Sequence, residues 1–187
     1  MEQQWIDQAR DGDMAAFDEL ARLYERKIYG LALRMCGNTD NAFDIAQDAL
    51  FSLYKSLPYF KGECAFSTWV YRLTANAAID FSRRRKKEAR LWLHDEDGDE
   101  YLTEIPDFRY DPASEYDRTA LREAIESALL KLKPEYRIAF ILRELHGLTY
   151  AEMADALECE EGTVKSRLFR ARAQLRKLLT LSGNFPG

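Results

Sequence analysis

Residues 160–179 read EEGTVKSRLFRARAQLRKLL, and this stretch decides the fold of the last part of the chain. Two acids are followed by six basic side chains with no further acid, and Leu or Val recurs every three or four residues. That spacing predicts an amphipathic helix with one buried face. Positive charge is concentrated on this one helix, although the whole chain has a net charge of −5. The positions that point inward are Val164, Leu168, Ala171 and Leu175.

The residues before this helix complete a helix-turn-helix pattern. Thr149 and Glu152 form an S/T-x-x-E capping box at the start of a short helix, YAEMADAL, and the turn ECEEG follows it. A short helix, a tight turn and a longer basic helix are typical of DNA-binding proteins, in which the second helix enters the major groove. Glu158 stands where many such turns have Gly, so we expect a strained turn or one of a different type.

The rest of the chain also has helical periodicity, and no segment has the alternation of a half-buried strand. The sequence therefore predicts an all-α fold. The further helices are expected between Asp13 and Gly37, over residues 39–58, from Ser67 into the basic run 83–87, from Ser114 onward, and between Pro134 and Gly147. The apolar stripe of the last of these includes Ile138, Ile141, Leu142 and Leu145.

Charge divides the chain into three parts. Residues 1–87 carry a net charge of +1, residues 88–117 carry −9 and residues 118–187 carry +3. The middle part also contains one Gly and two Pro and lacks helical periodicity, which is typical of a linker. We therefore expect two small helical domains, an N-terminal helical bundle and a C-terminal helix-turn-helix domain, joined by an acidic flexible linker, with the boundaries 1–90, 91–113 and 114–187.

Composition argues against several classes of protein. No run approaches the roughly 18 apolar residues of a membrane span, and the start MEQQWIDQARDG lacks a secretory signal. We expect a cytoplasmic protein that does not insert into a membrane. Cys36, Cys64 and Cys159 are far apart and the chain has two His, so we expect no disulfide framework, metal site or cofactor. We expect no catalytic residues either, because the acids of 95–100 lie in the linker, a poor scaffold for catalysis.

The outward face of the basic helix offers two kinds of DNA-binding group. Ser166 and Arg170 can reach base edges, and Phe169 can pack on a thymine methyl group. A solvated basic surface is the alternative, but such surfaces usually mix charges for i, i+4 pairing, and this helix does not. The side chains suited to phosphates are Lys165, Arg167, Arg172, Arg176 and Lys177.

Two stretches of the chain resemble regions of one protein family. LTYAEMADALECEEGTVKSRLFRARAQL resembles region 4 of the extracytoplasmic function (ECF) sigma factors, above all in G-T-V-K-S-R-L-x-R-A-R. DIAQDALFSLYKSLPYFKGECAFSTWVYRLTANAAIDFSRRRKK is similar to their region 2. The resemblance implies an alternative sigma factor, a non-enzymatic subunit that binds core RNA polymerase and directs it to promoter DNA in a stress or envelope response. It also implies a cognate anti-sigma factor as a partner.

The resemblance further implies roles for individual residues. The basic helix corresponds to the part that binds the −35 element. Aromatic residues beside a helix start more often pack in the core than bind bases, so that alternative stays open, and we expect Asp80 to pair with Arg83 or Arg84. The positions implied for the −10 element are Tyr59, Phe60, Lys61, Phe66, Arg72, Asn76, Ile79, Arg83 and Arg84. Those implied for core polymerase are Asp44, Gln47, Asp48 and Leu50.

A second hypothesis for the function stays open at this point. The chain could be a stand-alone transcriptional regulator, in which only the helix-turn-helix binds DNA and the first domain senses a signal or dimerises. Such a regulator binds an operator unaided, as a dimer on paired half-sites. Copurification with core RNA polymerase distinguishes the two hypotheses.

Overall fold

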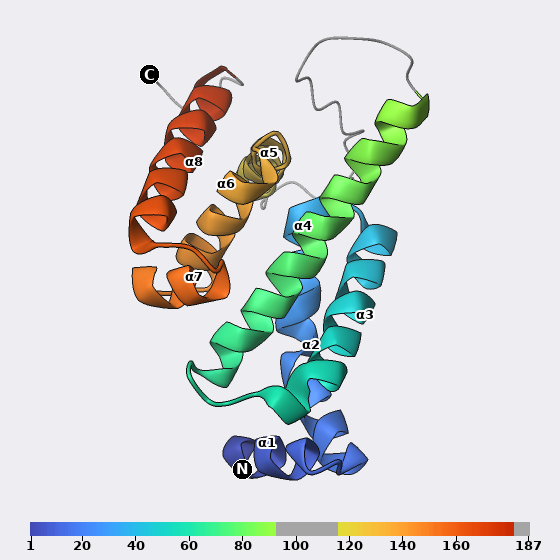
Figure 1. Ribbon diagram of the computed structural model, residues 1–187. Coiled ribbons are helices and arrows are strands. Elements are labelled where there is room, and N and C mark those ends of the chain that lie inside the picture. The colour runs from blue at the N-terminus through green and yellow to red at the C-terminus, as the bar shows by residue number, and fades with distance from the viewer. Residues whose placement is uncertain (93–115, 182–187) are drawn as a thin grey trace.

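The computed structural model describes residues 1–92 and 116–181, and all regular structure within these ranges is helical (Figure 1). This confirms the all-α prediction for the described residues. Most of the predicted linker and the helix start expected at Ser114 lie outside them. The elements are α1 (Glu2–Arg10), α2 (Met14–Cys36), α3 (Thr39–Ser56), the 3₁₀ turn η1 (Leu57–Tyr59), α4 (Phe66–Trp92), α5 (Tyr116–Leu130), α6 (Pro134–Phe140), the π-helical turn η2 (Ile141–Leu145), α7 (Tyr150–Ala156) and α8 (Glu161–Leu181).

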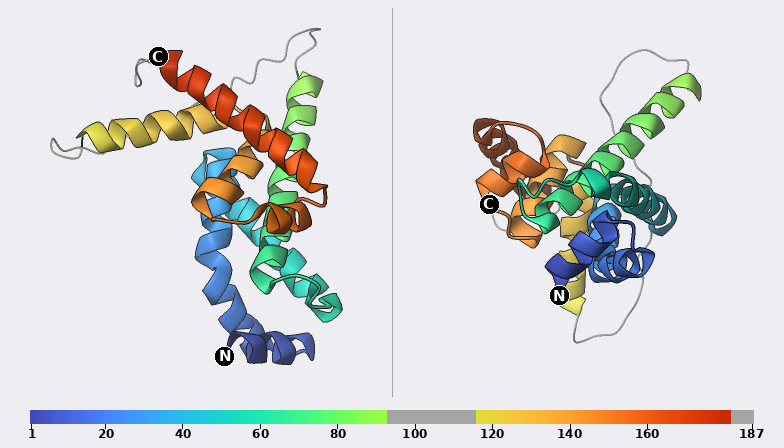
Figure 2. Two further views of the ribbon diagram at one scale, coloured as in Figure 1. Left: turned by 90° about the vertical axis from the view of Figure 1, so that its left-hand side faces the viewer. Right: turned by 60° about the horizontal axis from the view of Figure 1, so that its bottom comes forward.

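Helices α2, α3 and α4 pack together in the first half of the chain, and α1 lies across the end of α2 (Figures 1 and 2). The expected caps of α2 are present: the Asp13 side chain accepts hydrogen bonds from the first turn, and Gly37 ends the helix at a φ of 69°. Helix α1 was not expected from the sequence. It is held by Ile6 and Ala9, which are buried in the same core as Leu20 and Trp69.

The second half builds the expected helix-turn-helix. The Thr149–Glu152 capping box is formed in full at the start of α7, and Pro134 opens α6 as expected. The predicted inward face of α8 is confirmed, because each of its four residues is buried. Those residues are Val164, Leu168, Ala171 and Leu175.

One prediction for the apolar stripe of α6 is wrong. Ile138, Ile141 and Leu142 are fully buried, but Leu145 is half exposed. The cause is η2, in which the helix widens to a π turn. A π turn inserts extra residues into the helical repeat, so the residues at its end no longer follow the 3.6-residue spacing.

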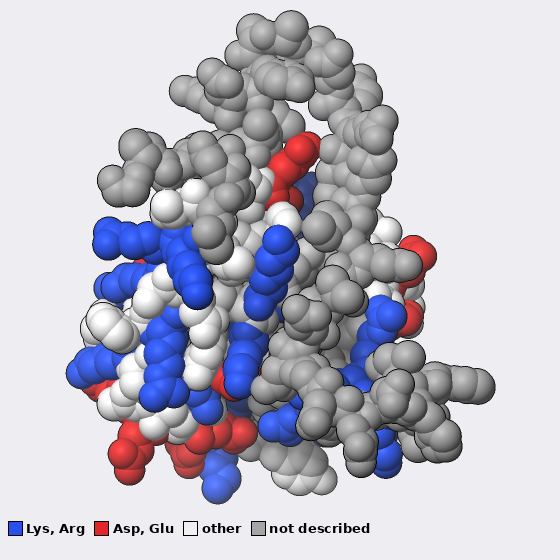
Figure 3. All heavy atoms as spheres, turned by 90° about the horizontal axis from the view of Figure 1, so that it is seen from above, with Lys and Arg blue, Asp and Glu red and all other residues white. Residues whose placement is uncertain are grey.

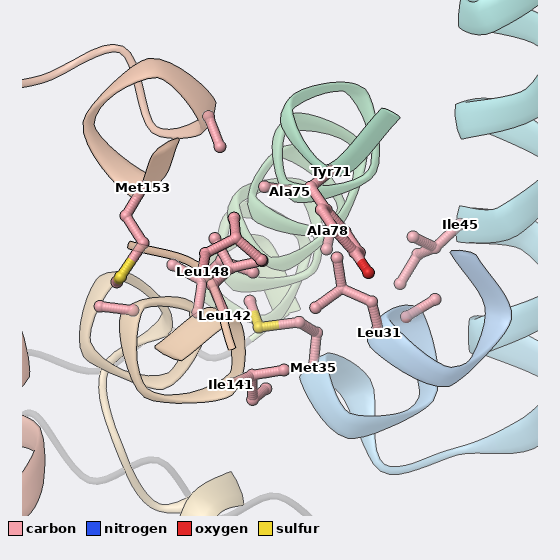
Figure 4. Close-up of a cluster of buried hydrophobic side chains, with 14 of the residues drawn as sticks. Leu31, Met35, Ile45, Tyr71, Ala75, Ala78, Ile141, Leu142, Leu148 and Met153 are labelled. Atoms are coloured by element: carbon pink, nitrogen blue, oxygen red, sulfur yellow. The ribbon is translucent and has the colours of Figure 1, made fainter. Parts of the chain in front are cut away.

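The two halves of the chain share one hydrophobic core. Leu31 and Met35 of α2 and Ala75 of α4 meet Leu142 of η2 and Met153 of α7 (Figure 4). Helix α4 therefore packs against α7 as well as against α2 and α3. The contact between the first half and the helix-turn-helix is therefore centred on apolar side chains.

A buried arginine joins the two halves beside this core. Arg137 of α6 is 8% exposed. Its guanidinium donates to the carbonyls of Leu130 and Leu132, at the end of α5, and to the carbonyl of Met35 at the end of α2. Gly37 lies next to this point, and a Cβ there would clash with the Leu130 side chain. Positive φ and this close approach both require glycine at position 37.

None of the described helices is both long and apolar enough to cross a bilayer. Within residues 1–92 and 116–181, no group of three or more His, Cys, Asp or Glu side chains is arranged to hold a metal ion.

Candidate nucleic-acid interface

The turn between α7 and α8 is strained, which is one of the two outcomes expected from Glu158 in the sequence. Glu158 has a φ of 49°, in the left-handed region that favours glycine. Its carboxylate lies 3.8 Å from a guanidinium nitrogen of Arg72 in α4. The turn therefore also contacts the first half of the chain.

The outward face of α8 presents its predicted DNA-binding residues to solvent. Phe169 is 74% exposed, and Ser166 and Arg170 beside it are exposed as well. This exposure leaves the Phe169 ring available for a contact with a partner. Seen from above, Lys and Arg side chains gather over the part of the surface that α8 forms, on the left of the view (Figure 3).

Several basic side chains of α8 are already held by neighbours. Lys165 pairs with Glu161 four residues earlier on the same helix, at 3.1 Å, so the expectation that this helix makes no i, i+4 pair is wrong at its first turn. Arg167 is partly buried, and its guanidinium lies 3.8 Å from the Cys159 sulfur. Arg176 and Lys177 are exposed near the end of the helix. The six cations of α8 are therefore not equivalent.

Two further contacts reach α8 from the neighbouring helix. The Arg170 guanidinium donates to the hydroxyl of Tyr136 in α6, at 3.2 Å. The Nε of Arg172 donates to the carboxylate of Glu144 in η2, at 3.2 Å. Sequence reasoning missed Tyr136 and Glu144, because nothing in the sequence indicates which residues of α6 and η2 face α8.

The aromatic residues just before and at the start of α4 differ in how exposed they are. Tyr59 is 80% exposed, and Lys61 beside it is exposed. Phe60 is partly buried and stacks on Trp69, with the ring centroids 4.7 Å apart. Phe66 is 6% exposed and packs in the core. The structure therefore brings the rings of Phe60, Phe66 and Trp69 together and leaves Tyr59 at the surface.

The predicted DNA-binding face of α4 is partly covered by the second half of the chain. Arg72 is half-buried against the helix-turn-helix, and Ile79 packs against the shared core. Asn76 is exposed between them. Further along, Arg83 pairs with Asp80 at 3.5 Å, as expected from the sequence.

Helix α3 presents an acidic and apolar surface. Asp44, Gln47 and Asp48 are exposed, whereas Leu50 is partly buried. Asp48 pairs with Arg84 of α4 at 3.1 Å. Sequence reasoning missed the exposed aromatic residues of this helix, although their positions off the buried stripe are the signal that could have found them. They are Phe43, Phe51 and Tyr54.

A histidine lies between the two halves of the chain. His146 Nδ1 is 3.1 Å from the Tyr71 hydroxyl, and its Nε2 is buried with no hydrogen-bond partner among the described residues. Burial, together with the nearby positive charges of Arg34 and Lys27, lowers the pKa of His146 to about 4. The imidazole is therefore neutral in the folded protein at pH 7.

This depressed pKa predicts a loss of stability in acid. The unfolded chain takes up a proton at His146 near its ordinary pKa of about 6.5, before the folded protein does. The stabilisation is complete above pH 6.5 and is lost as the pH falls toward 4. Allowing for partial exposure, we expect a loss of about 1–2 kcal/mol. Urea unfolding of the wild type and of His146→Gln at several pH values measures it. The unfolding free energy of the wild type must fall more than that of His146→Gln as the pH falls, and equal losses contradict the prediction.

Comparison with known proteins identifies the family. Residues 20–88 match Sigma-70 region 2, and residues 122–175 match Sigma-70, region 4. The chain is 35% identical over 188 residues to the RNA polymerase sigma-H factor of Pseudomonas aeruginosa, covering 95% of this chain and 93% of that protein. It is 37% identical over 178 residues to the ECF RNA polymerase sigma factor SigW of Bacillus subtilis, covering 93% of this chain and 94% of SigW. The chain belongs to the ECF sigma factor family.

Solved structures resemble the fold of this ECF sigma factor. CnrH, solved in complex with the cytosolic domain of CnrY, has a TM-score of 0.68 at 23% identity and covers 96% of this chain and 97% of its own. RpoE of Bartonella quintana, solved in complex with the anti-sigma factor NepR, has a TM-score of 0.65 at 23% identity and covers 88% of this chain and 96% of its own. The helices of regions 2 and 4 are therefore α2 to α4 and α5 to α8 in this protein.

Proposed function

We propose that this protein is an alternative sigma factor that binds core RNA polymerase and directs it to promoters, in a stress or envelope response. The observation that carries the proposal is the presence of region 2 and region 4 in one chain. A stand-alone regulator needs the helix-turn-helix but has no use for a region 2 with an exposed acidic and aromatic α3, so that alternative is not favoured.

Copurification tests the proposal. Mixed with core RNA polymerase, the chain should elute as a stable one-to-one complex that binds promoter DNA. A chain that elutes apart from core and binds DNA alone as a dimer would support the stand-alone regulator instead.

In this function α8 binds the −35 element. Ser166, Phe169 and Arg170 face the bases, and their exposure on one side of α8 supports this assignment. The residues proposed to bind phosphates are Lys165, Arg167, Arg176 and Lys177. Arg172 belongs to the same set by sequence, but in this structure its guanidinium is paired with Glu144.

Region 2 binds the −10 element through the loop before α4 and one face of α4. Tyr59 and Lys61 are exposed, and Phe60 is fixed by stacking on Trp69, which suits a flipped base that packs on an aromatic ring. Phe66 supports this surface from the core. The residues proposed on α4 are Arg72, Asn76, Ile79, Arg83 and Arg84.

Simultaneous binding of both elements requires the two halves to separate. Elements near −10 and −35 lie roughly 25 base pairs apart, which is about 85 Å of B-DNA. Helix α4, against which α7 packs, is only about 40 Å long. We therefore propose two domains, residues 1–90 and 114–187, joined by the acidic linker 91–113. Opening also uncovers Arg72, which Glu158 contacts in the closed structure.

Core polymerase binds α3 in this proposal, through Asp44, Gln47, Asp48 and Leu50. Charge reversal at Asp48 should lower the affinity for core about tenfold, since a charge at a protein interface is opposed by a complementary one. The unfolding free energy should change by less than about 0.5 kcal/mol, because the Asp48–Arg84 pair is exposed. Asp18→Lys on α2 is a matched control, exposed and with the same change in charge. Equal affinity of both variants for core in a competition assay contradicts the assignment.

As a specificity subunit the chain is not a catalyst and needs no metal or cofactor of its own. We place it in the cytoplasm, where core polymerase and promoters are, without insertion into a membrane. A cognate anti-sigma factor is a further proposed partner, on the grounds of family membership.

A further inference from the structure

Helix α6 and the π turn η2 run beside α8 and place one polar side chain against each of two exposed arginines. The Tyr136 hydroxyl is 3.2 Å from Arg170 Nη1, and the Glu144 carboxylate is 3.2 Å from Arg172 Nε. Both arginines lie on the exposed side of α8, but their partners differ in charge. The two contacts therefore have opposite effects on how each arginine meets DNA.

Tyr136 fixes its arginine without neutralising it. The tyrosine ring is partly buried against the core formed by α5, α6 and α8, so its hydroxyl has a defined position. Arginine has only donors, so the tyrosine oxygen accepts, and the hydroxyl proton stays free to donate elsewhere. Arg170 keeps its full charge and lies next to the exposed Phe169. A guanidinium that is held in place before binding loses less side-chain entropy when it reads a base.

Glu144 has the opposite effect on Arg172. Its carboxylate forms an ion pair with the guanidinium, through contacts to both Nε and Nη2. The paired charges attract a phosphate far less than a lone guanidinium does, and the carboxylate itself repels phosphate. Glu144 lies within the π turn η2.

We propose that Tyr136 is a positioning residue that holds Arg170 for base reading, and that Glu144 restrains Arg172 from binding phosphates, so that α8 favours one sequence over DNA in general. The inference rests on the proposed function, in which α8 binds the −35 element. Neither residue touches a base in this assignment, so each acts through its arginine.

Binding by the reconstituted holoenzyme tests both roles. The wild-type chain with core polymerase first selects duplexes from a pool randomised at the −35 element. Affinities for the selected duplex and for its single-base variants are then measured between 50 and 200 mM salt, concentrations chosen to span about 10³-fold or more in phosphate-driven affinity. The variants are Tyr136→Phe, Glu144→Gln and Arg170→Ala, and Glu123→Gln on the exposed side of α5 is the charge-matched control for Glu144→Gln.

Tyr136→Phe should lower the discrimination at one base pair about three- to tenfold, with the salt dependence unchanged. In the Arg170→Ala background the same change should have no further effect, which a merely structural role for the hydroxyl would not produce. Glu144→Gln should strengthen binding to all duplexes and steepen the slope of log K against log salt by about one, whereas Glu123→Gln should not.

Unchanged discrimination in Tyr136→Phe, or an unchanged slope in Glu144→Gln, overturns the inference. If the wild-type holoenzyme selects no −35 sequence at all, the proposed function fails instead. The selection step therefore separates the two failures.

Discussion

Replacing Arg137 with Met should lower the unfolding free energy by about 3–5 kcal/mol. Arg137 is 8% exposed, and its guanidinium donates to backbone carbonyls at the ends of both α5 and α2. Met fills much of the volume but offers no donor, so several buried carbonyls lose their partner at once. Because the Met35 carbonyl belongs to the first half of the chain, the contact between the halves should weaken as well.

Urea unfolding measures the effect of this substitution. Arg137→Lys should give an intermediate loss, because an ammonium keeps the charge but cannot reach carbonyls on both sides. Arg143→Met is the matched control: Arg143 is only partly buried, and its guanidinium donates to the carbonyl of Leu148. A loss below about 1 kcal/mol for Arg137→Met would show that the buried guanidinium does not hold the structure together.

Replacing Lys165, Arg176 and Lys177 with Gln should weaken holoenzyme binding to every promoter by a factor on the order of 10²–10³ at low salt. Each phosphate contact releases counterions, so losing Arg176 and Lys177 should reduce the slope of log K against log salt by about two, and losing Lys165, which is paired with Glu161, should add less than one. The relative preference among −35 sequences should persist, since these side chains are assigned to phosphates rather than to bases.

Fluorescence anisotropy with promoter duplexes over a range of salt concentrations checks this result. Gln substitutions at Arg10, Arg22 and Arg26, which are exposed on α1 and α2, remove the same charge from another surface. They should leave the slope unchanged. A parallel weakening in both triple variants would mean that net charge, rather than the α8 face, governs binding.

Local signals in the sequence predict the helices of this protein well. The Asp13 cap, the Thr149–Glu152 box and the buried face of α8 depend on neighbours within a few residues, and all of them are confirmed. Strain at Glu158 is also readable, because a side chain at a left-handed turn position is unfavourable in any context.

Features that depend on tertiary packing could not be predicted. Leu145 left the apolar stripe because the π turn interrupts the 3.6-residue repeat. The hydrogen bonds from Arg137 to the carbonyls of Met35 and Leu130 form only when the ends of α2 and α5 lie side by side, and no spacing in the sequence predicts that. For the same reason the contacts of Tyr136 and Glu144 with α8 appear only in the folded protein.

The candidate site also contains features that local sequence predicts and features that depend on tertiary packing. The exposed face of α8 follows from periodicity, and Phe169 lies on it as expected. The resemblance assigns Tyr59 and Phe66 to one DNA-binding surface, yet Tyr59 is exposed and Phe66 is in the core. Nor does the sequence indicate that the helix-turn-helix contacts Arg72 through Glu158.

Transcription in a purified system tests the sigma-factor proposal most directly. Core RNA polymerase free of other sigma factors is given a pool of DNA templates, with and without this chain, and the 5′ ends of the RNA are mapped. We expect transcripts that start at discrete sites, downstream of two shared sequence elements, only when the chain is present, and fewer of them with the Lys165, Arg176 and Lys177 triple variant. Identical 5′ ends with and without the chain would contradict the proposal.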